Sequence, residues 1–208
     1  MSKTQDVTDG RPEVPDIKHF EPEAVLDDVL RLFWRNGTAA TGIQDVVETT
    51  GLNRSSIYNT FGGKNELYIA ALHRYVDHYS QPAFKRLSED TRGLDAVRDF
   101  FSGLITARCQ GEYARWGCMV SNAHAGAERS QPDVSSILLD HHSRLIAALR
   151  TALDAARERG QLRAGTDLEA CAEHLALVAY GVNIRSRSGA CADELRRGVD
   201  AALAAVSA

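Results

Sequence analysis

A glycine turn followed by polar side chains marks the stretch from Gly42 to Phe61, GIQDVVETTGLNRSSIYNTF. Gly51 is the small residue that a tight turn between two steeply crossed helices needs. An arginine after such a turn can donate to guanine or phosphate, and a serine hydroxyl can bond to either. The N-terminal end of the second helix is the part that reaches base edges in a major groove. The pattern predicts a helix-turn-helix with the reading residues Arg54, Ser55, Ser56 and Asn59.

Further polar residues around these two helices could hold a DNA backbone. Tyr58 and Thr60 can reach phosphates, and Lys64 stands at a helix start, where free backbone N–H groups also attract phosphate. The alternative is a plain helical hairpin with exposed polar residues. The full set expected at the interface is Thr41, Gln44, Asn53, Arg54, Ser55, Ser56, Tyr58, Asn59, Thr60 and Lys64.

The four cysteines do not form a metal or disulfide pattern. They are Cys109, Cys118, Cys171 and Cys191, and none belongs to a CxxC pair. We therefore expect free thiols. Two groups of histidines could be metal ligands. His73 and Asp77 stand four residues apart, with His78 next, and His141 precedes His142. Solvated or pocket-lining histidines are far commoner, so no metal and no cofactor are expected.

An enzyme is the rival class of protein. The candidate nucleophiles are Cys118 and Cys109, with His124 as the candidate base. No phosphate loop, nucleophile elbow or zinc-protease motif accompanies them. The sequence therefore favours a non-catalytic protein, with a helical interaction module that binds no DNA as a third possibility.

The elements that must position these residues are almost all helices. Apolar residues such as Val25, Val29 and Phe33 recur every four positions, and no segment alternates as a strand does. The class is therefore all-α with about nine helices. Their expected ranges are 22–35, 41–51, 54–61, 64–80 before Pro82, 93–109, a short helix after Gly117, 132–159, 166–187 and 192–206.

Capping patterns set the expected starts of several helices. Thr41 with Gln44, and Thr166 with Glu169, have the spacing of capping boxes. Asn53 can cap the helix that follows it.

Composition and charge are ordinary for a soluble globular protein and do not exclude a local DNA-binding face. The chain has 208 residues and a formal net charge of −4, which argues against a general basic coat but allows a small cationic face. The polar start resembles no signal peptide, and the apolar run 175–182 is too short to span a bilayer. We expect a cytoplasmic protein with no membrane contact. Its expected parts are a flexible tail over 1–18, a DNA-binding domain over 19–79 and a C-terminal domain over 80–208.

From Val25 to Leu72 the sequence resembles the DNA-binding domain of the tetracycline-repressor (TetR) family. The similarity rests on VLDDVLRLFWRNG, on the T-x-I-x-D-V motif from Thr41, on GLNRSSIYNTF and on KNEL at the fourth helix. The resemblance implies that Tyr58 and Lys64 meet phosphates and that Phe61 packs the domain. Two departures are Val47, where the family often has Ala, and Gly42, where it often has Ser or Thr and so a hydroxyl that can bind phosphate.

The resemblance also implies a homodimer on a palindromic double-stranded DNA operator, released by a small-molecule inducer. The dimer would form through helices 167–187 and 192–206, whose small residues allow close approach. The alternative is that these small residues fill the core of one subunit. They are Ala172, Ala176, Ala179, Gly181, Ala201 and Ala205.

The inducer pocket would lie among the middle helices, although aromatic residues there could equally be core. The expected lining is Phe101, Tyr113, Trp116, Cys118, Met119, Asn122, His141 and His142. The G-C-x-x-x-N segment around Cys118 further resembles a subgroup of the family in which some members sense oxidants or electrophiles. Arg115 could favour the reactive thiolate of Cys118. The alternative is a buried cysteine that acts as a small apolar residue.

Overall fold

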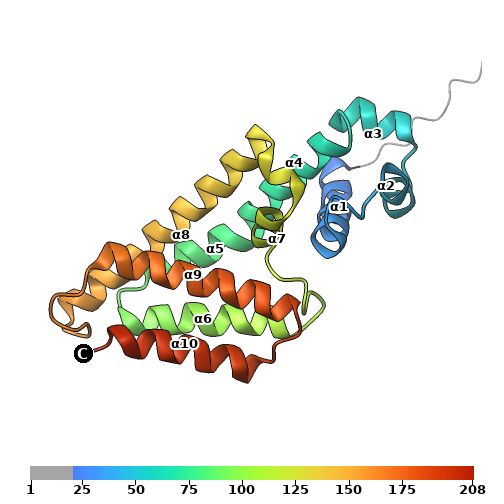
Figure 1. Ribbon diagram of the computed structural model, residues 1–208. Helices are drawn as coiled ribbons and strands as arrows, with labels where there is room; N and C mark the ends of the chain where they lie inside the picture. Colours follow the sequence, from blue (N-terminus) through green and yellow to red (C-terminus); the bar gives the residue numbers. More distant parts are fainter. Residues whose placement is uncertain (1–20) are drawn as a thin grey trace, which may run out of the picture.

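A computed structural model describes residues 21–208, and most of this part of the chain is helical (Figure 1). Extended backbone pairs only at an isolated bridge between Leu162 and Ser207 within the described range. The all-α expectation is confirmed, whereas the tail expected over 1–18 lies outside the described residues. The α-helices are α1 (Pro22–Asn36), α2 (Ile43–Thr50), α3 (Arg54–Phe61), α4 (Lys64–Tyr75), α5 (Gln81–Glu89), α6 (Leu94–Cys109), α7 (Met119–Ala125), α8 (Pro132–Glu158), α9 (Leu168–Arg187) and α10 (Ala192–Val206).

The fourth predicted helix does not stop before Pro82. A π-helical turn, η1 (Val76–Ser80), joins α4 to α5, and the Gln81 N–H bonds to the Val76 carbonyl five residues back. Pro82 falls in the first turn of α5, where its missing N–H costs no hydrogen bond. The predicted end of the helix was wrong, because Pro82 stands in the first turn of the next helix and does not interrupt the helical chain.

Two capping predictions also need correction. The Thr41 hydroxyl donates to the Gly37 carbonyl at 2.7 Å, so α2 starts later and Gly42 donates to the Asp45 carboxylate instead. Asp167, rather than Thr166, accepts the first N–H groups of α9. In both places a nearby carboxylate accepts from the free backbone N–H groups at the helix start.

Apolar side chains form two cores that meet along α8. The first core buries residues from α1 and α4, such as Val29 and Leu72, together with Val120 of α7 and Val134 at the start of α8. The second core lies among α5, α6, α9, α10 and the later turns of α8. α2 and α3, the helices predicted to read DNA, therefore rest on a core that α7 and α8 complete.

Aromatic rings connect α1 to the end of α4 and to the loop after α6. The buried Trp34 ring packs edge-on against Tyr75 and Trp116, with centroids 4.9 and 5.4 Å away. Its indole N–H donates to the Gly117 carbonyl at 2.9 Å. Arg187 of α9 adds bonds to the Trp34 and Trp116 carbonyls. This contact ties α1 to α9 of the C-terminal part.

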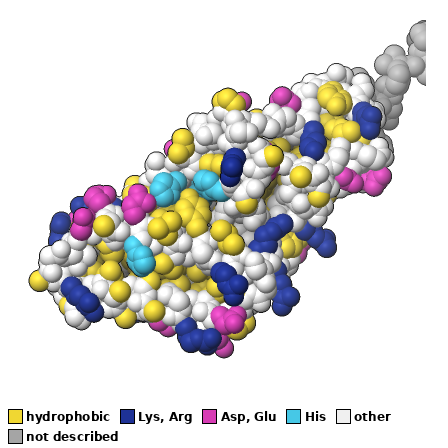
Figure 2. Space-filling model, in the orientation of Figure 1, with side chains coloured by type: hydrophobic (Ala, Val, Ile, Leu, Met, Phe, Trp, Pro, Cys, Tyr) yellow, Lys and Arg dark blue, Asp and Glu magenta, His cyan; other side chains and the backbone are white. Residues whose placement is uncertain are grey.

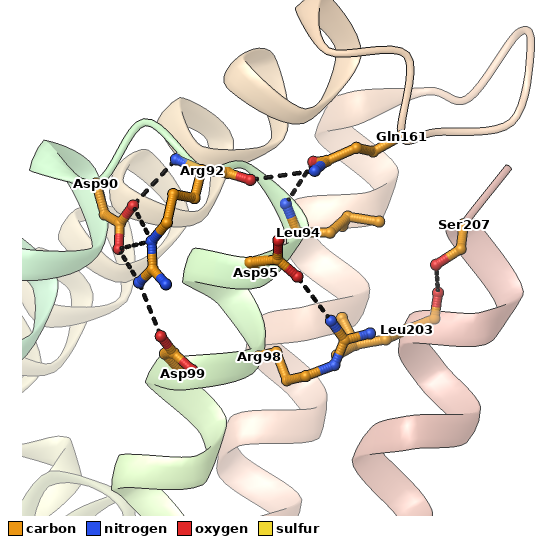
Figure 3. A network of polar contacts seen from close by, with 9 residues as sticks. All are labelled: Asp90, Arg92, Leu94, Asp95, Arg98, Asp99, Gln161, Leu203 and Ser207. Carbon is orange, nitrogen blue, oxygen red and sulfur yellow. Dashed lines mark hydrogen bonds and ion pairs between the residues drawn. The ribbon is translucent and has the colours of Figure 1, made fainter.

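At the opposite end of α6, Gln161 fixes the start of the helix (Figure 3). Its side-chain oxygen accepts from the Leu94 N–H at 2.9 Å, and its amide donates to the Arg92 carbonyl at 3.2 Å. Gly93 between them has φ 73°, and an added Cβ would lie 2.7 Å from the Ala156 Cα. This corner therefore needs glycine. Over residues 21–208, none of the helices has the length and apolar character needed to cross a membrane.

Candidate nucleic-acid interface and effector cleft

The turn between α2 and α3 has the backbone geometry that the sequence predicts. Gly51 is left-handed, with φ 69° and ψ 6°, and its N–H closes α2 on the Val47 carbonyl at 2.8 Å. Val46 of α2 and Ile57 of α3 are fully buried against the first core. These contacts fix the angle of α3 and leave its opposite face in solvent.

The exposed face of α3 carries the predicted reading residues. Asn53 accepts from the Ser56 N–H at 2.8 Å, so its side chain caps α3 rather than reaching outward. Ser56 is half-buried at this first turn. The freely exposed side chains are Arg54, Ser55, Tyr58, Asn59 and Thr60.

Polar groups from both helices lie where α3 meets the start of α4. Tyr58 is 51% exposed, and its ring lies beside Gly63, whose added Cβ would lie 3.4 Å from the ring edge. Gly63 leads directly into α4, whose first N–H groups point out of the helix. The Lys64 ammonium lies close by and donates to the Thr38 carbonyl at 2.7 Å. The Tyr58 ring and the Lys64 ammonium therefore both lie near the start of α4, where the Glu66 carboxylate also approaches Gly63.

The preceding helix contributes less than the sequence suggested. Thr41 is 1% exposed and its hydroxyl is bonded to backbone, so the structure corrects its place in the DNA-contact set. Gln44 is exposed, and its amide donates to Glu48 at 3.2 Å. The acidic side chains of Asp45 and Glu48 are exposed on the same helix. Cationic contact with DNA therefore falls mainly to α3 and the start of α4.

An ion pair holds α4 against α1. The Arg74 guanidinium donates to both Asp27 oxygens, at 2.6 and 2.9 Å, and also to Glu23. Hydrogen bonding from Arg74 holds the pKa of Asp27 below its usual value. This bidentate pair fixes the helix that connects the reader to the rest of the chain.

A cleft opens between α5 and α6, with a smaller chamber at its inner end. The cleft has a volume of about 390 Å³ and the chamber about 50 Å³. The two spaces are adjacent, because Tyr79, Ala83, Phe100, Leu104 and Arg108 line both. The chamber is further lined by Ser80, Phe84, Cys118, Ser121, His141, Leu145, Ala179, Tyr180 and Asn183.

The structure brings only two of the predicted pocket residues into this chamber, Cys118 and His141. Met119 and Asn122 line a separate groove of about 450 Å³ beside α7. The other four line neither the cleft nor the chamber, and the structure corrects their assignment. Phe101 is fully buried in the second core, Tyr113 and Trp116 pack on Trp34, and His142 lies against Tyr180 and Glu173.

Helix phase explains the correction at Phe101. Phe101 continues the stripe of Leu94 and Val97, which faces the second core, whereas the next side chain, Phe100, turns toward the cleft. The sequence reasoning missed Arg108 altogether. Arg108 follows Phe101 by seven positions on the same stripe, and a charged residue at a core position was the available signal.

Cys118 is buried, with 3% exposure, and its sulfur lies beside Tyr75 and Arg108. The structure therefore places Arg108 at this thiol, whereas the sequence suggested Arg115. Arg115 is exposed, and its N–H bonds to the Arg108 carbonyl. In residues 21–208, no cluster of His, Cys, Asp and Glu has the arrangement of a metal site.

The small residues expected at a dimer contact are partly core. Ala172 and Ala176 are fully buried and Ala179 is 3% exposed, so they pack inside one subunit, as the alternative reading held. The outward face of α9 instead carries Leu177 and Ile184, 66% and 54% exposed. Figure 2 shows apolar side chains and histidines gathered over α8 and α9.

Comparison with known proteins agrees with this architecture. The model of the tetR family of bacterial regulatory proteins matches residues 25–71, and that of the tetracyclin repressor-like C-terminal domain matches residues 93–204. The HTH-type transcriptional repressor ComR of Escherichia coli (strain K12) is 29% identical over 187 residues, covering 89% of this chain and 86% of ComR. The regulator YezE of Bacillus subtilis (strain 168) is 26% identical, covering 89% and 96%.

Solved structures share the fold. A cysteine mutant of the TetR family transcriptional regulator CifR, complexed with 26-bp double-strand operator DNA, matches with a TM-score of 0.78 and 22% identity. The match covers 95% of this chain and 100% of that one. Reduced NemR of E. coli matches with a TM-score of 0.74 and 20% identity, covering 88% and 96%.

Proposed function

Because the chain belongs to the TetR family of DNA-binding transcriptional regulators, and is therefore not an enzyme, we propose that it is a homodimeric repressor released from its operator by a small-molecule effector. The observation that supports this most directly is the exposed polar face of α3 beside the start of α4. ComR, named as a repressor, is related over most of its length. A regulator that acts on DNA would work in the cytoplasm, where we expect this protein.

A dimer would present two reading helices to the DNA, whereas one subunit presents a single copy of α3. Two copies of α3, about one DNA turn apart, would read successive major grooves of a palindromic operator. The exposed apolar side chains of α9 and the open alanines of α10, Ala201 and Ala205, form a surface that a second copy can cover. The proposed contact therefore keeps the predicted pair of helices but uses their outward faces.

Release follows from the connection between cleft and reader. The cleft is lined by α5 and α6, and α5 continues through the π turn into α4. An effector that binds better to one spacing of the two heads will shift the population toward that spacing. α4 is the proposed transmitter, because it begins at Lys64 beside the reading helix and ends at the π turn that leads to the cleft.

The test is fluorescence anisotropy of the full chain on DNA from just upstream of its own gene, at fixed salt. We expect tight binding that survives competition by unrelated DNA. Equal affinity for both DNAs would contradict a sequence-reading repressor, and an absence of DNA binding would contradict the proposed interface.

A second candidate signal is oxidation or electrophile modification of Cys118. The observation in its favour is that this thiol lines the chamber next to the Arg108 guanidinium. Mild oxidant would then release the DNA, and added thiol would restore binding. Cys118→Ser should abolish this response, with Cys191→Ser, an exposed thiol, as the matched control. Unchanged release in Cys118→Ser would exclude this signal.

A further inference from the structure

Arg108 is a buried cation that no carboxylate of residues 21–208 neutralises. The residue is 8% exposed. Its Nε donates to the Asn183 side-chain oxygen at 2.6 Å and an Nη donates to the Tyr75 hydroxyl at 2.9 Å. Burial raises the pKa of Tyr75, so this hydroxyl stays neutral. A guanidinium has five N–H donors, so several remain available. Among residues 21–208, no carboxylate pairs with Arg108, and a buried charge in this state favours any anion that can reach it.

Another arginine of the same cleft shows the opposite arrangement. Arg92 pairs with Asp90 at 2.5 Å and with Asp99 at 2.7 Å, and all three line the outer part of the cleft (Figure 3). The charge of Arg92 is therefore neutralised within the chain. The inner end retains the positive charge of Arg108.

Two further polar groups of the chamber lack partners. The Ser121 hydroxyl and the His141 Nδ1 are buried, and neither forms a hydrogen bond within the described residues. The His141 Nε2 lies 3.1 Å from the Ser80 hydroxyl. If that hydroxyl donates to Nε2, the ring proton lies on Nδ1, which can then donate to a bound group. Arg108, Ser121 and His141 thus offer donors to the same small space.

The chamber also has apolar walls. Its walls include Phe84, Phe100, Leu104, Leu145 and Ala179. Such walls suit an alkyl or aromatic body, while the donors suit a carboxylate. We propose that the cleft between α5 and α6 binds a small organic carboxylate with an apolar body, whose charged group pairs with Arg108. This inference rests on the proposed function, because it names the chemical class of the effector.

The same contacts couple the carboxylate to the reader. Arg108 is bonded to Tyr75, the last residue of α4 before the π turn. Tyr75 packs on Trp34 of α1, and the Arg108 guanidinium lies 5.7 Å from the Trp34 ring centre. A carboxylate that draws the guanidinium toward the cleft weakens its bond to Tyr75 and changes the surroundings of Trp34. Binding should therefore alter tryptophan fluorescence.

The experiment titrates the full chain, without DNA, with benzoate, phenylacetate, hexanoate and octanoate, each beside its neutral primary amide. Binding is followed by calorimetry and by tryptophan fluorescence. We expect saturable binding of at least one acid below about 10 mM, with its amide at least tenfold weaker. An amide that binds as tightly as its acid overturns the proposal, and so does the absence of binding by every acid.

Variants then test the assigned cation. Arg108→Gln removes the charge and should weaken acid binding at least tenfold while leaving amide binding nearly unchanged. Arg98→Gln, exposed on the same helix and outside the cleft, is the control for net charge. A folded Arg108→Gln protein that binds acid as the parent does overturns the proposal. If that variant fails to fold, the comparison of each acid with its amide on the parent protein decides whether the site binds carboxylates.

A DNA measurement keeps this inference distinct from the proposed function. DNA binding by the free protein tests the repressor, and acid binding by the free protein tests the carboxylate site. The acid that binds should also lower operator affinity in the parent but not in Arg108→Gln. Acid binding without any DNA binding would refute the repressor alone, whereas DNA binding without acid binding would refute the carboxylate site alone.

Discussion

At the residue scale, the tip of α3 separates reading from anchoring. Arg54 is exposed at the first turn of α3, where a bidentate contact with guanine can form. We expect Arg54→Ala to weaken the free energy of operator binding by about 1–3 kcal/mol and to relax base preference at one position.

Tyr58→Phe removes one hydroxyl that is expected to bind phosphate, so it should weaken binding to all DNA sequences alike. Anisotropy on the operator and on single-base variants measures both, with Arg98→Ala as a distant control. Loss of base preference in Tyr58→Phe alone would contradict these roles.

His141 makes stability depend on pH. Burial lowers its pKa to about 4, below the value of about 6.5 expected in the unfolded chain. Between these values the unfolded chain binds more protons, so stability is full above pH 6.5 and is lost as the pH falls toward 4. The other charged groups around it are His124, His142 and Arg144, which disfavour protonation, and Asp140, which favours it.

Urea unfolding at two pH values measures this contribution. From about pH 7.5 to 5.5, His141 should account for a loss on the order of 1 kcal/mol. His141→Gln keeps a polar amide but cannot titrate, so it should lose less stability than the parent over the same interval. An equal loss in both proteins would show that His141 is not the titrating group.

At the element scale, the start of α6 depends on a single glycine. In Gly93→Ala the new methyl group would meet the Ala156 backbone at 2.7 Å, at a φ of 73°. We expect this change to lower the free energy of unfolding by more than about 2 kcal/mol. Gly103→Ala, within α6 and with open space around it, should be neutral or slightly stabilising. Thermal melts compare the two, and equal melting temperatures would contradict the steric argument.

Helix ends were harder to predict than helices. The sequence placed α3 and the turn at Gly51 well, because an N-cap and a left-handed glycine are local features. It misplaced the starts of α2 and α9, where Thr41 and Thr166 bond backward to carbonyls and neighbouring carboxylates take the caps. Hydrogen-bond partners a few residues apart compete, and the residue types and their spacing alone do not choose between them.

At the scale of the whole molecule, the outward face of α9 is the proposed dimer contact. Leu177 is 66% exposed, so Leu177→Arg should leave the stability of one subunit within about 0.5 kcal/mol. A charge there should nevertheless convert the dimer to a monomer and weaken operator binding more than tenfold. Light scattering after gel filtration measures the mass. Ser102→Arg places the same charge on an exposed part of α6 as a control. If the Leu177→Arg protein stays dimeric, the dimer contact does not lie on this face of α9.

The sequence by itself determined the all-α class, the reading turn and most of the residues on α3. These follow from periodicity, caps and glycine, which act within a few residues and leave a readable local pattern. Only the tertiary structure decided which side of each longer helix is buried. It buried Ala172 and Ala176, turned Phe101 into the core and brought Arg108, Ser121 and His141 from three helices into one chamber. A cavity is formed by residues distant in the chain, and its lining depends on helix phase and crossing, which no local pattern specifies.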